Sequence, residues 1–216
     1  MKTSSKVIAA VLGVAVFGFL AYSQLPTGGT HSMPGMGTSA STSESANAYG
    51  KAMTGMMAGM MVPLTGKPDL DFMQGMIPHH QGAIDMAKIV LQYGKDAEIR
   101  TLAENVVKAQ EGEIAFMQGW LGKTDQSTLA AVPESSKANG EAMATLMKNM
   151  MLPPTGDADV DFVKGMIPHH QGAIDMAKVA LPYAKDPEVL KLANDIVTAQ
   201  ETEIAFMTDW LARKAK

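Results

Sequence analysis

Apolar residues recur with the 3.6-residue period of an α-helix along most of the chain beyond residue 46. The pattern and its turn residues predict helices at about 47–62, 68–93 and 96–121, and again at 137–152, 158–184 and 186–213. No stretch alternates apolar and polar positions with β-branched enrichment, so we expect no sheet. The hydrophobic pattern therefore predicts an all-α protein.

The two groups of predicted helices are copies of each other. The segment "GMIPHHQGAIDMAK" runs from Gly75 to Lys88 and returns, unchanged, 90 positions later. We therefore expect a first helical repeat at 47–121, a linker at 122–136 and a second repeat at 137–216. Three helices of this size bury little apolar surface alone. The longer helices of both repeats should form one four-helix bundle, with the short Met-rich helices packed against it.

The start of the chain has the features of an export signal. Residues 1–6 carry two lysines, residues 7–20 are apolar or glycine, and small residues allow cleavage after Ser23. The apolar run is short for a membrane span, which needs about 20 residues. The alternatives are a cleaved signal peptide and an uncleaved N-terminal anchor within residues 1–23, followed by a flexible linker at 24–46. In both cases we expect a periplasmic or extracellular protein.

Composition and charge limit the function classes. The chain has no cysteine, so it has no disulfide and no thiolate ligand. Its formal charge of −4 becomes −6 without residues 1–23, because they contain Lys2 and Lys6 and no acid. This charge argues against a nucleic-acid partner, and against membrane binding other than through an uncleaved N-terminal segment. Nineteen methionines, and four of five histidines in two HH pairs, are the unusual features.

The second helix of each repeat carries a histidine pair between methionines. At about 100° per residue, Met76, His79, His80 and Met86 share one inward arc. Pro78 lacks an N–H and is expected to kink the helix and splay the two histidines. The equivalent set in the second repeat is Met166, His169, His170 and Met176.

Methionine also dominates the inward arc of the two short helices, at nine of ten positions. The plain interpretation is a core stripe, since methionine fills irregular gaps. A core normally uses leucine, however, because leucine specifies packing better. The candidate ligands in these helices are Met53, Met57, Met60, Met61, Met143, Met147, Met150 and Met151.

The third helix places Glu113 within an apolar stripe, and Glu203 repeats it. A carboxylate there needs a partner. It could accept the N–H of a histidine that binds metal, or pair with a lysine. Met117 and Met207 on the same stripe are ligands or core residues.

Thioether sulfur is a soft ligand that selects Cu(I), and imidazole binds Cu(II) or Cu(I). Methionine and histidine can therefore bind copper in a chain that has no cysteine. The combined methionine and histidine positions therefore predict a copper site, and Ag(I) is a further soft ion that such a site could bind.

The repeated "GMIPHHQGAIDMA" segment resembles the hallmark of domain-of-unknown-function family 305, and the resemblance covers about residues 50–213. It implies a ferritin-like helical bundle and an exported copper-binding protein, linked to copper resistance, that uses the methionines and histidines named above. One departure is Met73, which becomes Val163, so the two halves need not bind copper equally.

We expect a protein that buffers or sequesters copper and is not an enzyme, with a copper-sensing or copper-transport protein as a further partner. A ferritin-like di-iron or di-manganese oxidase would need Glu-x-x-His motifs. Here Glu113 and Glu203 are followed three places later by Phe116 and Phe206. The remaining alternative is a Met-rich helical adaptor that binds peptides.

Overall fold

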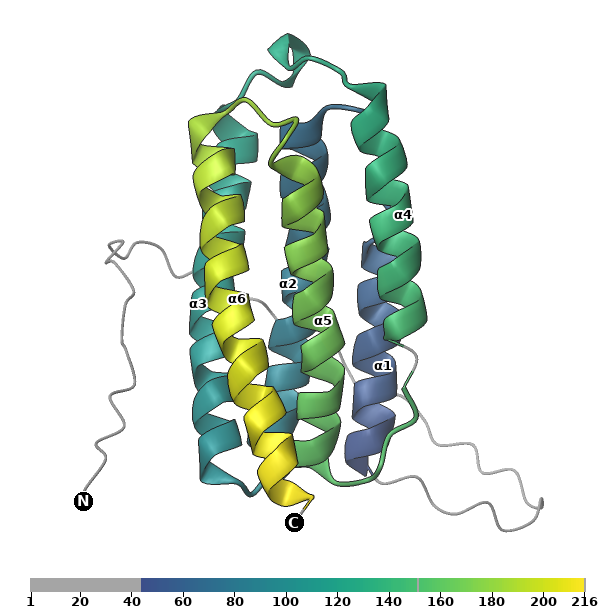
Figure 1. The fold of residues 1–216 in the computed structure, drawn as a ribbon, viewed down its shortest axis with the longest axis vertical. Helices are drawn as coiled ribbons and strands as arrows, with labels where there is room; N and C mark the ends of the chain where they lie inside the picture. The colour runs from purple at the N-terminus through teal and green to yellow at the C-terminus, as the bar shows by residue number, and fades with distance from the viewer. Residues whose placement is uncertain (1–43, 151, 216) are drawn as a thin grey trace, which may run out of the picture. The chain divides into compact units, whose positions relative to one another are not determined.

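The computed structural model describes residues 44–150 and 152–215, and within these ranges it contains helices and no strand. The expectation of an all-α protein is confirmed. A short 3₁₀ helix, η1, spans Gln126–Thr128. The six α-helices are α1 (Glu44–Gly59), α2 (Pro68–Tyr93), α3 (Ala97–Lys123), α4 (Pro133–Asn149), α5 (Ala158–Ala180) and α6 (Pro187–Lys214) (Figure 1).

The helices form three layers of two (Figure 1). The middle layer is α2 and α5, which pack against each other. On one side α3 packs on α2 and α6 packs on α5, which completes the expected four-helix bundle. On the other side the shorter α1 and α4 pack on α2 and α5. Any group at the contact between α2 and α5 is therefore covered from both sides.

Local sequence signals account for where the helices start and stop. The Asp96 carboxylate accepts from Glu98 N and Ile99 N and caps α3. Proline, which needs no N–H partner in the first turn, opens α2, α4 and α6. The second repeat departs from the first at α5, which ends at Ala180 although a helix to 184 was expected. Pro182 stands where α2 has Gln92, and proline cannot continue the hydrogen-bond ladder.

A Pro-Leu-Thr-Gly turn precedes α2 and is held by Asp71. Its carboxylate accepts from Thr65 N at 2.8 Å and from Gly66 N at 3.0 Å. Gly66 has φ +78°, a conformation that side chains rarely adopt, so the turn requires glycine there. Asp161 and Gly156 repeat this arrangement before α5.

Two other aspartates join the halves of the chain. Asp69 in α2 accepts from Lys185 N at 3.0 Å and Asp186 N at 2.9 Å, in the turn between α5 and α6. Asp159 in α5 accepts from Lys95 N at 2.9 Å and Asp96 N at 3.2 Å, in the turn between α2 and α3. Each half therefore holds the backbone of the other half's turn, at opposite ends of the bundle (Figure 1).

The predicted signal or anchor at 1–23 and most of the predicted linker at 24–46 lie outside the described residues. The helix α1 begins at Glu44, inside that linker range. Among the helices that are described, none combines the length and the hydropathy that crossing a bilayer requires.

We expect Asp159→Ala to lower the free energy of unfolding by about 1–3 kcal/mol, because it leaves two backbone N–H groups in the α2–α3 turn without their acceptor. Asp69→Ala should cost a similar amount, and the double variant should cost the sum, since the two sites share no partner. The control is Asp175→Ala, which removes only a surface contact with Gln171 and should change stability by less than about 0.5 kcal/mol. Urea denaturation measures all four proteins, and equal stability of Asp159→Ala and Asp175→Ala would contradict the role assigned to these turns.

Candidate metal centre

Four histidines lie next to one another in the core, and each is 0% exposed. His79 of α2 faces His169 of α5, with ring centroids 3.8 Å apart. His80 follows on one side at 6.3 Å from His79, and His170 on the other at 6.1 Å from His169. The two sequence motifs, 90 residues apart, therefore meet in one buried cluster. We call His79 and His169 the inner histidines, and His80 and His170 the outer histidines.

The outer histidines are each held by a glutamate from the neighbouring helix. His80 Nε2 lies 2.6 Å from Glu113 Oε2 in α3, and His170 Nε2 lies 2.6 Å from Glu203 Oε2 in α6. Of the two partners expected for these glutamates, the structure therefore places the histidine beside them. An N–H on Nε2 that donates to the carboxylate leaves the lone pair on Nδ1. Neither Nδ1 has a hydrogen-bond partner.

The inner histidines are kept neutral. Burial is the main cause that lowers the pKa of His79 well below its usual value near 6.5, and repulsion from His169 and His80 adds to it. Burial also lowers the pKa of His169, followed by repulsion from His170. The His169 Nε2–H donates to the backbone oxygen of His79 at 2.9 Å, whereas both nitrogens of His79 lack a partner. Neutral imidazole is the form that binds metal ions.

Methionines of α2 and α5 pack across the contact between these two helices. A Cβ on Gly165 of α5 would lie 3.5 Å from Met86 Sδ, and one on Gly75 of α2 would lie 3.2 Å from Met176 Cε. Each methionine therefore reaches across to the opposite helix. Met76 and Met166 are also fully buried, in the core of the bundle.

Glycines on α2 and α5 let the outer layer come close to the histidines. A Cβ on Gly82 would lie 2.6–2.9 Å from three atoms of Met56 in α1, so glycine is required at this approach. A Cβ on Gly172 would lie 2.4 Å from Leu146 in α4 and 3.3 Å from Nε2 of His79. The contact of α4 with the middle layer thus lies beside the inner histidine His79.

The predicted methionine ligands differ in their burial. Buried are Met60, Met76, Met86, Met117, Met150, Met166, Met176 and Met207. Half-buried in α1 and α4 are Met53, Met57, Met143 and Met147. The side chain of Met61, beyond the end of α1, is 74% exposed and is not brought to the cluster. Met151 lies outside the described residues.

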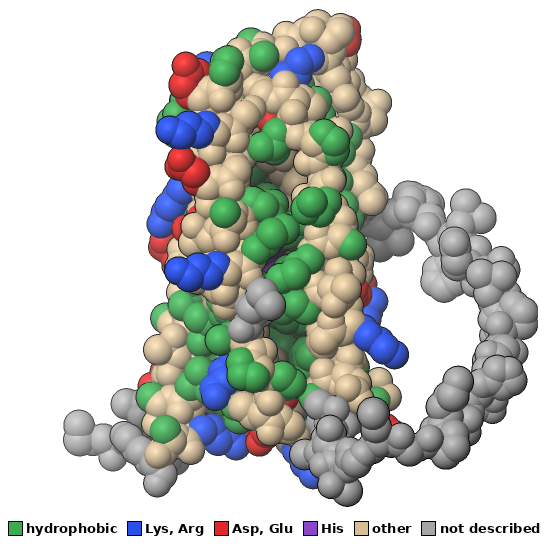
Figure 2. All heavy atoms as spheres, turned by 90° about the vertical axis from the view of Figure 1, so that its right-hand side faces the viewer, with side chains coloured by type: hydrophobic (Ala, Val, Ile, Leu, Met, Phe, Trp, Pro, Cys, Tyr) green, Lys and Arg blue, Asp and Glu red, His purple; other side chains and the backbone are tan. Residues whose placement is uncertain are grey.

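Figure 2 shows the face formed by α1 and α4. A band of hydrophobic side chains runs along it, and a histidine is visible at the bottom of a hollow in this band. Because every imidazole in the cluster is 0% exposed, the hollow is too narrow for water to reach the rings. The half-buried methionines belong to α1 and α4, the two helices that form this face.

Two kinds of residue at the centre were missed as candidates from sequence. Met56 is buried against α2. The second repeat has leucine at the equivalent position, so Met56 was not among the methionines that both repeats share. Gln110 and Gln200 are buried, and each has an Oε1 atom without a hydrogen-bond partner. The sequence feature that could have identified the two glutamines is their position, three residues before Glu113 and Glu203 and therefore on the same helix face.

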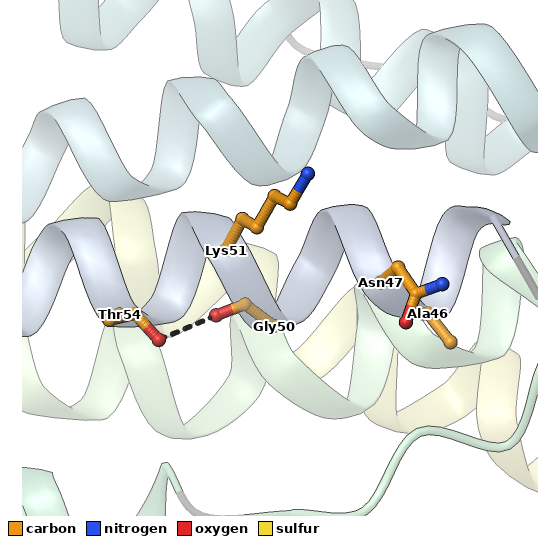
Figure 3. A pocket seen from close by; sticks show the side chains of 5 residues that line it. All are labelled: Ala46, Asn47, Gly50, Lys51 and Thr54. Atoms are coloured by element: carbon orange, nitrogen blue, oxygen red, sulfur yellow. Dashed lines mark hydrogen bonds between the residues drawn. The ribbon is translucent and has the colours of Figure 1, made fainter. Parts of the chain in front are cut away.

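A second hollow lies on the N-terminal half of α1 (Figure 3). It is lined by Ala46, Asn47, Gly50, Lys51 and Thr54, and the Thr54 hydroxyl donates to the Gly50 oxygen at 2.9 Å. No methionine or histidine lines it, and its charged side chain is a lysine. This hollow therefore offers a soft metal ion neither a thioether nor an imidazole. In the described part of the chain, no three His, Cys, Asp or Glu side chains are grouped to hold a metal ion.

Residues 69–211 match the family model of DUF305, described as a domain of unknown function. The chain is similar to CopM in its Cu(I)-bound form, with 33% identity and a TM-score of 0.54, over 68% of this chain and 98% of CopM. CopM structures with Cu(II) and with Ag match it similarly.

Two further relatives extend the comparison. A DUF305 protein from Streptomyces coelicolor, described as a candidate secreted protein, is 27% identical with a TM-score of 0.54, over 70% of this chain and 95% of that protein. The uncharacterized protein L153 of Acanthamoeba polyphaga mimivirus is 43% identical over 53 residues, which are 24% of this chain. The match spans 35% of the length of that viral protein.

The metal-free protein should lose stability as the pH falls below about 6.5. In that range the unfolded chain binds protons on His79 and His169 that the folded chain, with its lowered pKa values, does not bind. Each imidazole contributes at most about 2 kcal/mol between pH 6.5 and pH 5. Urea denaturation at several pH values, with a chelator present, should show a weaker pH dependence in the variant His79→Gln/His169→Gln. Identical pH profiles of wild type and variant would mean that these two rings are not kept neutral by the fold.

Proposed function

This chain belongs to the DUF305 family, and we propose that it is an exported copper-binding protein that buffers or sequesters Cu(I) and Cu(II). The observation that carries the proposal is a set of five buried imidazole nitrogens without a hydrogen-bond partner: Nδ1 of His79, His80, His169 and His170, and Nε2 of His79. Buried polar atoms of this kind normally have a partner, because leaving one unpaired costs about 1–3 kcal/mol. A metal ion would satisfy such atoms.

The donor atoms of the cluster suit copper. The outer histidines present Nδ1 while their Nε2 is held by glutamate, an arrangement that orients an imidazole toward a metal and raises its basicity. The inner histidines are neutral without any metal. Thioethers from the middle layer and from α1 and α4 add soft donors that carry no proton and favour Cu(I) or Ag(I). Imidazoles supply the donors for Cu(II).

The relatives support the same assignment. CopM, which is 33% identical to this chain, has been solved with Cu(I), with Cu(II) and with Ag. We infer that this chain binds these ions through its own methionines and histidines and catalyses no reaction. Binding copper outside the cytoplasm would contribute to copper resistance or homeostasis.

The proposal of export depends on the predicted signal or anchor at the start of the chain. Residues 1–23 carry the predicted signal or anchor, and the Streptomyces coelicolor relative is described as a candidate secreted protein. An exported copper buffer delivers its ion to, or receives it from, a copper-sensing or copper-transport protein.

The proposal is tested by metal analysis of the full chain, recovered from the exported fraction of cells grown with added copper. We expect copper in the purified protein. Iron or manganese would support the oxidase alternative, and a metal-free protein that does not take up Cu(I) or Cu(II) on titration would overturn the proposal in favour of a peptide-binding adaptor. A variant with all four cluster histidines changed to Asn, checked for its helical circular dichroism, is the control for bound Cu(II).

The methionines in and just after α1 can be tested separately. Changing Met53, Met57, Met60 and Met61 to Leu keeps side-chain volume and should cost under about 1.5 kcal/mol per site. The variant should therefore fold, retain Cu(II) binding and bind less Cu(I), as measured by anaerobic titration against a competing chelator. The same changes at the equivalent positions of the second repeat, Met143, Met147, Met150 and Met151, provide the matched comparison. Unchanged Cu(I) binding in a folded variant would favour the core-stripe interpretation.

A further inference from the structure

The two halves of the buried cluster are not chemically equal. Met56 of α1 corresponds to Leu146 of α4, and Met73 of α2 corresponds to Val163 of α5. All four side chains are buried, at 5%, 3%, 0% and 0% exposure in that order. At both positions the first half has a thioether where the second half has a branched hydrocarbon. Of the two, Met56 is the one that packs from the outer layer onto Gly82 of α2, three residues after His79.

Position 56, like position 146, is where the outer layer meets the middle layer. A Cβ on Gly82 would lie 2.7 Å from Met56 Sδ, so the glycine lets this sulfur rest directly on the backbone of α2. On the other side, Leu146 rests on Gly172, and the Nε2 atom of His79 lies next to that glycine. The unpaired nitrogen of His79 thus has a leucine beside it, which offers no donor atom.

The other inner ring, His169, contacts α2 near the place where Met56 packs. Its Nε2 lies 2.9 Å from the backbone oxygen of His79, about one helical turn before Gly82 on α2. Met56 packs on Gly82 itself. Met56 and His169 therefore contact α2 within about one helical turn of each other. The Nδ1 atom of His169 is buried and has no hydrogen-bond partner.

We propose that Met56 is a ligand for Cu(I) or Ag(I) at the inner histidines, and that it draws the soft ion to the first half of the cluster. This inference rests on the proposed copper-binding function. Leucine at the equivalent position 146 shows that packing against glycine does not require a methionine. What methionine adds is a polarizable sulfur that needs no deprotonation. The cluster therefore has one preferred soft-metal position, displaced from its centre toward α1.

The test exchanges the two residues between the halves. Met56→Leu makes the first half like the second, Leu146→Met does the reverse, and the double variant moves the methionine to the other side. Each new side chain already occupies the equivalent position, so all three variants should fold. Leu102→Met, which adds a buried methionine in α3, is the control for a sulfur placed elsewhere in the core.

We expect anaerobic Cu(I) and Ag(I) titrations to show that Met56→Leu weakens the tightest site by at least about tenfold, since even the partners of metal ligands are worth that much. Leu146→Met should add a second tight site, the double variant should have one tight site again, and Leu102→Met should behave like wild type. In wild type labelled with ¹³C-methyl methionine, the first equivalent of Ag(I) should shift the Met56 methyl resonance.

The outcomes separate this inference from the proposed function. If wild type binds Cu(I) and Ag(I) and Met56→Leu binds them equally tightly, Met56 is not a ligand, although the copper-binding proposal stands. An unshifted Met56 methyl resonance in Ag(I)-saturated wild type has the same meaning. If wild type binds neither ion, both proposals fail together.

Discussion

Packing of α2 against α5 keeps His79 and His169 away from water, and the other features of the centre depend on that contact. The two rings lie 3.8 Å apart between centroids and are fully buried. A charge there would lose its hydration and would repel the neighbouring imidazoles, so both rings remain neutral. The fold thus presents unprotonated nitrogen atoms to a ligand, at the expense of leaving several of them without a hydrogen bond.

Adjacent histidines take different roles because successive residues of a helix point about 100° apart. His79 points toward α5 and α4, whereas His80 points toward α3, where Glu113 holds its Nε2. The three layers therefore separate an inner pair of closely packed rings from two outer rings that are oriented by carboxylates. One dipeptide supplies donors to two environments of the same cluster.

The two halves depend on each other for their turns while differing at the centre. The carboxylates of Asp69 and Asp159 bind backbone N–H groups of the opposite half, so neither half has a complete set of hydrogen bonds alone. The framework is close to symmetric, but Met56 and Leu146 make the environment of the inner rings unequal. A symmetric scaffold with unequal donors can favour one ion position over its mirror position.

The sequence by itself determined the helical class and most helix ends, because helical period and caps are local properties. It required a partner for Glu113 but left histidine and lysine open, and the packing of α3 on α2 decided for His80. The deviation at Pro182 is also local and could have been predicted from the loss of an N–H. Only the tertiary structure decided that His79 meets His169, that Met61 stays 74% exposed and that Met56 is buried on Gly82. A methionine stripe covers a broad arc of a short helix, and which part of it becomes buried depends on where that helix lies on its neighbour. Contacts between residues 90 positions apart follow from how the helices pack, which helical period alone does not specify.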